Sequence, residues 1–230
     1  MGGFGLMIDG QQVVVPEASQ RLVALLALAC VPLDRRLAAS RLWPDKTDDR
    51  AAANLRSSLW RLPCMDGAEI ITVVSNRLAL HDAIDVDVRR VERQGWSLVE
   101  HPEQCAADLD RSLLFAELLP AWYDEWLLAE RERLAQLQLH FVEALAYEQL
   151  RRGAIAEALD NALRLVAIDP LRERSQRVLL TVYCTEGSLG QAQRQLDRYG
   201  MLLDEAFGCR PSLSIGRILL EIEERLAAST

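Results

Sequence analysis

The sequence predicts an α+β region over residues 1–94 and an all-α region over 95–230. The first region carries β-branched, alternating runs near both ends with helical patterns between them, whereas the second carries helical patterns alone. In the second region, several residues recur after 34 positions, which indicates stacked helix pairs. Because half of the 230 residues are apolar, the chain can bury a core in each region.

The first region begins with two short strands in "FGLMIDGQQVVV", joined by a turn at Asp9-Gly10. Three helices are expected next, over 17–29, 34–43 and 48–62, each followed by a proline. Asp34 is expected to cap the second of them, and Asp48 or Asp49 the third.

A second hairpin is expected in "IITVVSNRLALHDA", with Ser75-Asn76-Arg77 at its tip. Two strands, three helices and a closing hairpin form the layout of a winged helix-turn-helix. In that fold the third helix is the one that enters a DNA major groove.

The all-α region contains an internal repeat with the tetratricopeptide period of 34 residues. Matching pairs are Gly153 with Gly187, Ala158 with Ala192, and Leu145 with Leu179. The glycines suit helix-helix turns and the alanines suit close packing. We therefore expect an α+β N-terminal winged helix-turn-helix followed by an all-α tetratricopeptide-like helical domain.

The sequence contains no G-x-S-x-G, H-E-x-x-H or Cys-His arrangement that would indicate an enzyme, and its net charge argues against a protein that coats nucleic acid by bulk attraction. The net charge is −8, but residues 17–62 hold 8 basic and 5 acidic side chains and so form a locally basic stretch. The histidines, His81, His101 and His140, lack metal-ligand spacing, so neither a metal nor a cofactor is expected. Five cysteines without a C-x-x-C pair, and no signal or membrane segment, predict a cytoplasmic protein with free thiols.

The expected third helix has two faces. Leu55, Leu59 and Leu62 share the face that would enter the core. The other face predicts side chains that could contact base edges: Asn54, Ser57, Ser58 and Arg61. A plain solvated surface is the alternative for this face.

Several arginines are candidates for contact with the DNA backbone. They are Arg35, Arg36 and Arg41 on the second helix, Arg50 and Arg56 on the third, and Arg77 at the hairpin tip, where a narrow minor groove would attract it. Surface positions without a partner are the alternative for each. The acidic pair Asp48-Asp49 would oppose phosphate contacts unless it points away as a helix cap.

The chain resembles a known family over nearly its whole length. The strings "RLVALLALA" and "AAANLRSSLWRL" are similar to the winged-helix half of the bacterial transcriptional activators that include the Streptomyces antibiotic regulatory proteins. "LLPAWYDEWLLAERERLAQLQLHFVEALA" and "AIDPLRERSQRVLL" resemble the helical activator domain of that family.

The resemblance implies a DNA-binding activator that sits on promoter direct repeats as a head-to-tail homodimer and recruits RNA polymerase. A second hypothesis is a protein-protein adaptor whose winged helix has lost DNA affinity. That alternative is favoured by Pro63, which replaces basic residues usual in the family, and by the balanced charge of residues 1–95.

Overall fold

The fold comes from a computed structural model that describes residues 1–29, 31–65, 68–105, 111–212, 214–218, 220 and 224. The chain forms two compact units. The winged-helix unit consists of Met1–Arg93 and Asp110–Leu137, and the repeat unit of Gln94–Leu109 and Gln138–Thr230. The domain ranges 1–94 and 95–230 stay a prediction. The free thiol predicted for Cys30 is not tested, because Cys30 lies outside the described residues.

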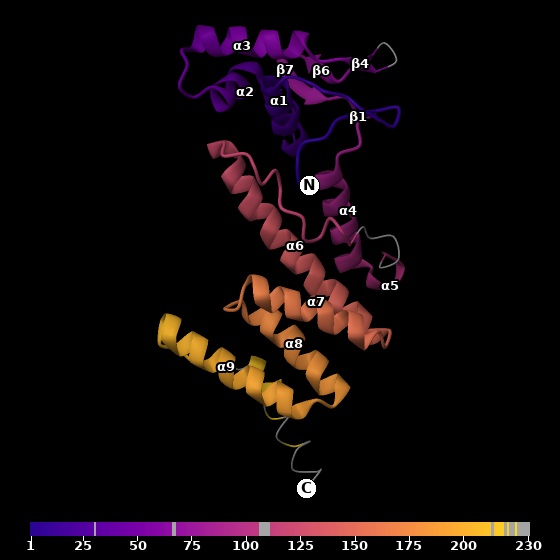
Figure 1. The fold of residues 1–230 in the computed structure, drawn as a ribbon, viewed down its shortest axis with the longest axis vertical. Coiled ribbons are helices and arrows are strands. Elements are labelled where there is room, and N and C mark those ends of the chain that lie inside the picture. The colour runs from indigo at the N-terminus through magenta and orange to yellow at the C-terminus, as the bar shows by residue number, and fades with distance from the viewer. Residues whose placement is uncertain are drawn as a thin grey trace. The chain divides into compact units, whose positions relative to one another are not determined.

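The winged-helix unit has the layout that the sequence predicts (Figure 1). Its elements are β1 (Met7–Ile8), β2 (Gln11–Gln12), α1 (Glu17–Leu28), β3 (Leu33–Asp34), α2 (Arg35–Leu42), α3 (Asp48–Trp60), β4 (Cys64–Met65), β5 (Ala68–Glu69), β6 (Ile71–Val74), β7 (Arg77–Leu80) and the start of α4 (Asp87–Glu100). Strands β3, β7 and β6 form one antiparallel sheet, while β1 pairs with β2 and β4 with β5.

Both predicted hairpin turns are present. Asp9 and Gly10 have φ of 52° and 76°, and Ser75 and Asn76 have φ of 48° and 68°. Two successive residues with positive φ are what a tight two-residue hairpin turn requires, and Asn, Asp and Gly adopt this conformation most readily. Arg77 belongs to β7, where it pairs with Val74, so the turn itself is Ser75-Asn76.

Helix boundaries follow the predicted caps with one exception. The Asp34 carboxylate accepts a hydrogen bond from the Arg36 amide at 2.8 Å, which makes Asp34 the N-cap of α2 as expected. For α3 the prediction was wrong, because Thr47 is the N-cap and Asp48 and Asp49 form the first turn. There their charges favour the positive end of the helix dipole.

Helix α3 packs with its inner face on α1 and α2. Ala51, Leu55 and Ser58 are its buried residues, each at most 3% exposed. The Ser19 hydroxyl donates to the backbone oxygen of Ser58 at 2.9 Å. The prediction of Ser58 as a DNA-contacting residue is therefore wrong: three positions after Leu55, it lies on the core side of the helix.

Residues 111–137 complete the winged-helix unit. The Gly2 amide donates to the Glu117 carbonyl at 2.7 Å, and the Leu119 amide donates to the Gly2 carbonyl at 2.9 Å. An apolar cluster joins this segment to α1, and its buried members are Ala24, Leu28, Val88, Leu118, Leu119, Leu127 and Leu134. Trp122 and Trp126 are partly buried and pack against the same cluster.

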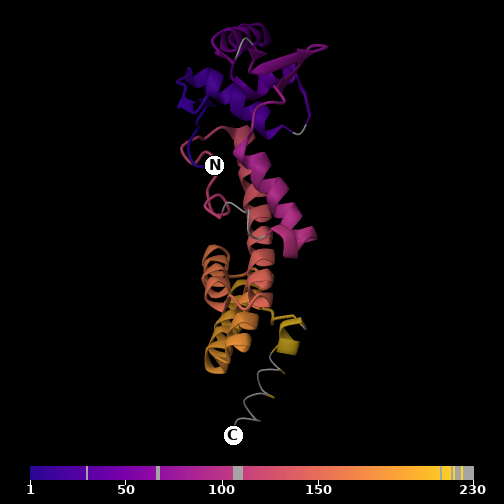
Figure 2. The ribbon, with the colours of Figure 1, turned by 90° about the vertical axis from the view of Figure 1, so that its right-hand side faces the viewer.

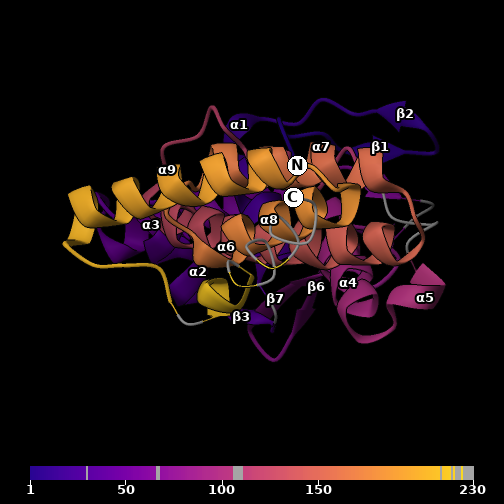
Figure 3. The same ribbon diagram turned by 90° about the horizontal axis from the view of Figure 1, so that it is seen from below.

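The repeat unit contains the end of α4, α5 (Pro102–Cys105), the second half of α6 (Glu125–Arg151), α7 (Ile155–Ile168), α8 (Glu173–Glu186) and α9 (Leu189–Phe207). Helix α8 packs against both α7 and α9, and Figure 3 shows α9 along its length in front of them. Gly153 and Gly187 have positive φ at the two helix-helix turns, and Ala158 and Ala192 are fully buried. The predicted tetratricopeptide-like repeat is confirmed at these positions.

A buried carboxylate stabilises the end of α6. Glu148 accepts from Arg151 Nε at 2.8 Å and from Arg152 Nε at 2.5 Å. Arg152 also donates to the Glu103 carbonyl at 2.9 Å, which attaches α5 to α6. The hydrogen bond from Arg151 holds the pKa of Glu148 below its ordinary value of 4.5, although burial of the carboxylate opposes this.

We predict that Glu148→Gln lowers the free energy of unfolding by about 1–3 kcal/mol at pH 7. Because the folded-state pKa is lowered, this stabilisation is complete above 4.5 and is lost as the pH falls through the folded-state value. Urea denaturation at neutral and acidic pH measures the effect, with the exposed Glu132→Gln as control. A difference from the native protein that stays constant with pH would contradict the assignment.

We also predict opposite outcomes for neighbouring serines of α3. Ser58→Lys should lower the free energy of unfolding by more than about 2 kcal/mol, because it places a charge at a buried site. Ser57→Lys should change it by less than about 0.5 kcal/mol, because Ser57 is exposed. Thermal unfolding followed by circular dichroism compares the two, and equal melting temperatures would show that Ser58 is not on the core side.

Candidate nucleic-acid interface

The exposed face of α3 is the central feature of the candidate interface. Arg50, Arg56, Ser57 and Arg61 are exposed, and Asn54 is half-buried. Helix α3 ends at Trp60, with Arg61 as the C-cap, so its backbone has left the helix before Pro63. The structure thus brings together four of the predicted side chains and leaves Asn54 at the edge of their face.

A second basic group surrounds the turn of the β6–β7 hairpin. Asp34, the cap of α2, lies opposite Arg77 in the backbone register of the antiparallel strands β3 and β7. The Arg35 amide donates to the Asn76 carbonyl at 3.2 Å, and the Asn76 side chain contacts the Asp34 carboxylate at 3.4 Å. Residues Arg35, Arg36 and Arg77 are therefore neighbours, although they are far apart in the sequence. Figures 1 and 2 show this hairpin and α3 at the same end of the unit.

The candidate arginines differ from arginines with a structural role because their side chains form neither an ion pair nor a hydrogen bond within the described residues. Within the described residues, no ion pair is formed by any of the seven candidates, which are Arg35, Arg36, Arg41, Arg50, Arg56, Arg61 and Arg77. All except the half-buried Arg35 are exposed. In contrast, Arg21 pairs with Asp124, and Arg89 donates to three carbonyls at the end of α1. The free guanidinium groups can bind anions without breaking a bond in the protein.

Acidic side chains limit this surface at one end of α3. Asp48 and Asp49 are exposed in the first turn, next to Arg50. Their charge would repel a phosphate close to that turn, whereas the other end of the helix carries Arg56 and Arg61 without an acidic neighbour in its last turn. Phosphate or base contacts are therefore favoured towards the C-terminal half of α3.

The structure adds one residue that the sequence reasoning missed. Trp60 is 86% exposed at the end of α3. It follows Arg56 by four residues and Ser57 by three, so all three share a helix face. The signal that could have revealed it is its helical spacing, which separates Trp60 from the buried Leu55 and groups it with the polar face.

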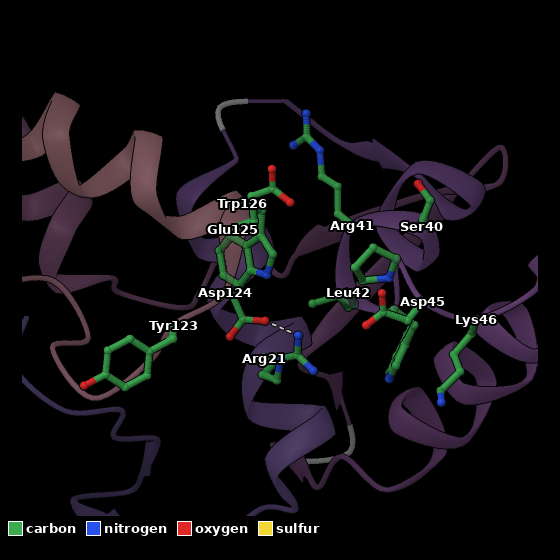
Figure 4. A pocket seen from close by; sticks show the side chains of 12 residues that line it. Arg21, Ser40, Arg41, Leu42, Asp45, Lys46, Tyr123, Asp124, Glu125 and Trp126 are labelled. Atoms are coloured by element: carbon green, nitrogen blue, oxygen red, sulfur yellow. Dashed lines mark hydrogen bonds and ion pairs between the residues drawn. The ribbon is translucent and has the colours of Figure 1, made fainter.

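A pocket of about 590 Å³ lies beside α2, between the α2–α3 turn and residues 123–126. Figure 4 shows Arg21 and Asp124 joined across it, with Arg41 and Lys46 on the α2–α3 side and Tyr123 and Glu125 opposite. Acidic and basic groups both line it, and the lining contains no histidine or cysteine.

Within the described part of the chain, no group of histidine, cysteine and acidic residues could hold a metal ion. None of the described helices combines the length and the apolar character needed to cross a membrane. Cys184 is buried, whereas Cys209 is exposed.

Comparisons with known proteins bear on the whole architecture. The chain is similar in structure to EmbR of Mycobacterium tuberculosis, solved in complex with a low affinity phosphopeptide, with a TM-score of 0.81 and 16% sequence identity. The match covers 97% of this chain and 64% of the EmbR chain, so this chain spans less than two thirds of that protein. At this identity the likeness shows the fold, a winged helix-turn-helix followed by a helical domain. A comparison with curated proteins gives no match.

The family comparison is more specific, because the model of the bacterial transcriptional activator domain matches residues 86–223. This range begins just before α4 and runs through α9, so it includes the whole predicted repeat. More than half of the chain is matched, and the resemblance seen in the sequence is confirmed. The chain belongs to the bacterial transcriptional activator domain family, a family of transcription regulators.

Proposed function

We propose that this protein is a sequence-specific DNA-binding transcriptional activator that binds promoter direct repeats and recruits RNA polymerase. The observation that carries the proposal is the set of unpaired arginines on α3, α2 and the β6–β7 hairpin of a winged-helix unit. In winged helix-turn-helix proteins the helix in this position enters the major groove. Membership of the activator family supports the same function.

Each part of the surface has a separate role in this proposal. Arg61, Ser57 and Asn54 contact base edges, and Arg61 is suited to the bidentate pairing that arginine makes with guanine. The remaining arginines bind the sugar-phosphate backbone, and they are Arg35, Arg36, Arg41, Arg50 and Arg56. Arg77, which opens β7 directly after the hairpin turn, enters the minor groove. Ser58 has no place in this set, because it is buried.

We also propose that two copies bind direct repeats as a homodimer and that they recruit RNA polymerase. Two copies in the same orientation would place two α3 helices on one face of the duplex when the repeats are about one helical turn apart. The repeat unit, as a stack of helix pairs, supplies the kind of extended surface that binds other proteins. Transcription in vitro from a promoter with one or two repeats tests both parts.

The test of DNA binding begins with selection of duplexes from a random pool by the full chain. Affinity for a selected and a scrambled duplex is then measured over a range of salt concentrations. We expect tighter binding to the selected duplex and a modest slope of log K against log salt, corresponding to about 4–6 phosphate contacts per subunit. A slope near zero and equal affinity for both duplexes would favour the adaptor, which the exposed acidic pair Asp48-Asp49 also favours.

We predict that Arg61→Ala weakens binding to the selected duplex by about 1–3 kcal/mol and relaxes the preference at one base pair. Arg56→Ala should weaken binding to both duplexes and lower the salt slope by about 0.9. The matched control is Arg210→Ala, which removes an exposed arginine from the repeat unit and should change neither quantity. Equal losses in all three variants would show that α3 does not face DNA.

A further inference from the structure

Trp60 is the most exposed of the aromatic side chains on the helices of the described chain, with 86% of its surface accessible. Other tryptophans have packing partners: Trp122 stacks on Phe4 with ring centroids 6.1 Å apart, and Trp96 contacts His140 and Phe141. Trp60 makes no ring contact within the described residues. Tryptophan and arginine are among the residue types that contribute most to binding energy at interfaces.

The surroundings of Trp60 define the chemistry of its partner. Arg56, one helical turn earlier, and Arg61, the next residue, are both exposed and without an ionic partner. A partner that satisfies all three residues offers hydrogen-bond acceptors on both sides of an apolar group. A DNA major groove has this arrangement, because phosphates at its border can accept from Arg56, guanine acceptors on its floor can accept from Arg61, and the C5-methyl group of thymine is the apolar group on that floor.

We propose that Trp60 contacts the C5-methyl group of one thymine in the major groove and so determines specificity at that base pair. This inference rests on the proposed DNA-binding function and assigns one position of the target site. Because Trp60 lies in the last turn of α3, the thymine would lie on the side of the site bound by Arg56 and Arg61. Burial of the thymine methyl group against the indole of Trp60 would favour thymine over the other bases at that position.

The test removes the methyl group from the DNA and the indole from the protein. Each thymine of the selected duplex is replaced in turn by deoxyuridine, which pairs identically but lacks the C5-methyl group. For the native protein we expect one position at which binding weakens about fourfold, the effect of about one buried methyl group. For Trp60→Ala, binding to the thymine duplex should weaken, and deoxyuridine at that position should have no further effect.

Control variants test whether the indole itself causes the deoxyuridine effect. Tyr123→Ala removes a side chain that is 87% exposed but lies outside α3, and it should keep the deoxyuridine effect. Circular dichroism of Trp60→Ala should match that of the native protein, because the side chain is not part of the core. Trp60→Phe should keep part of the deoxyuridine effect, since phenylalanine also offers an apolar ring to a methyl group.

The outcomes distinguish this inference from the proposed function. If the native protein selects a duplex but no deoxyuridine substitution weakens binding, or if Trp60→Ala keeps the effect, the inference is wrong while DNA binding stands. If sedimentation shows instead that Trp60→Ala disrupts a dimer without altering the deoxyuridine effect, Trp60 joins two copies and the inference is again wrong. If the native protein selects no duplex, the proposed function itself fails.

Discussion

The winged-helix unit depends on a single arginine that holds a later part of the chain against its core. Arg131, in α6, donates to the backbone oxygen of Leu118 at 2.7 Å and of Trp122 at 2.6 Å, and also to that of Leu119. Leu119 has a positive φ of 46°, a conformation that is unfavourable for leucine. Three charged hydrogen bonds and the burial of its side chain compensate for this strain.

The clamped segment supports the candidate interface through a series of contacts. Leu118 and Leu119 pack on Ala24 and Leu28 of α1, and α1 in turn binds the end of α3 through Ser19. The family model matches residues 86–223, so part of the matched region lies in the same compact unit as α3. Loss of the Arg131 contacts would therefore loosen the support of α3, even though Arg131 is not among the residues that we assign to DNA.

The arginines of this chain fall into two physical classes. Some saturate their donors inside the protein, as Arg89 does at the carbonyls of Leu26, Ala27 and Ala29. Helix ends leave carbonyls without partners, and a guanidinium group with several donors can satisfy them together. Others, including Arg56 and Arg61, keep all their side-chain donors free. Because 26 of the residues are basic, charge alone does not identify a surface that can bind an anion, and the candidate arginines are selected by both their free donors and their position on α2, α3 and the β6–β7 hairpin.

Local features of the fold could be derived from the sequence. Asp9-Gly10 and Ser75-Asn76 are hairpin turns because few residue types tolerate positive φ in succession. Gly153 and Gly187 end helices for the same reason, and their spacing of 34 residues is sufficient to reveal the repeat. These features depend on neighbours in the chain, so pattern and residue type determine them.

The tertiary structure alone decided which side chains of α3 are accessible. Ser58 and Trp60 look like surface and core residues by polarity, yet Ser58 is 3% exposed and Trp60 86% exposed. Their environment depends on the angle at which α1 and α2 cover α3, and on a hydrogen bond between Ser19 and Ser58, 39 residues apart. Likewise, the sequence indicated a helix at Arg131, but its carbonyl partners follow from the folded path of residues 118–122. Composition and spacing determined the elements, and the resemblance of particular strings indicated the family, whereas long-range packing determined the surface that the elements present.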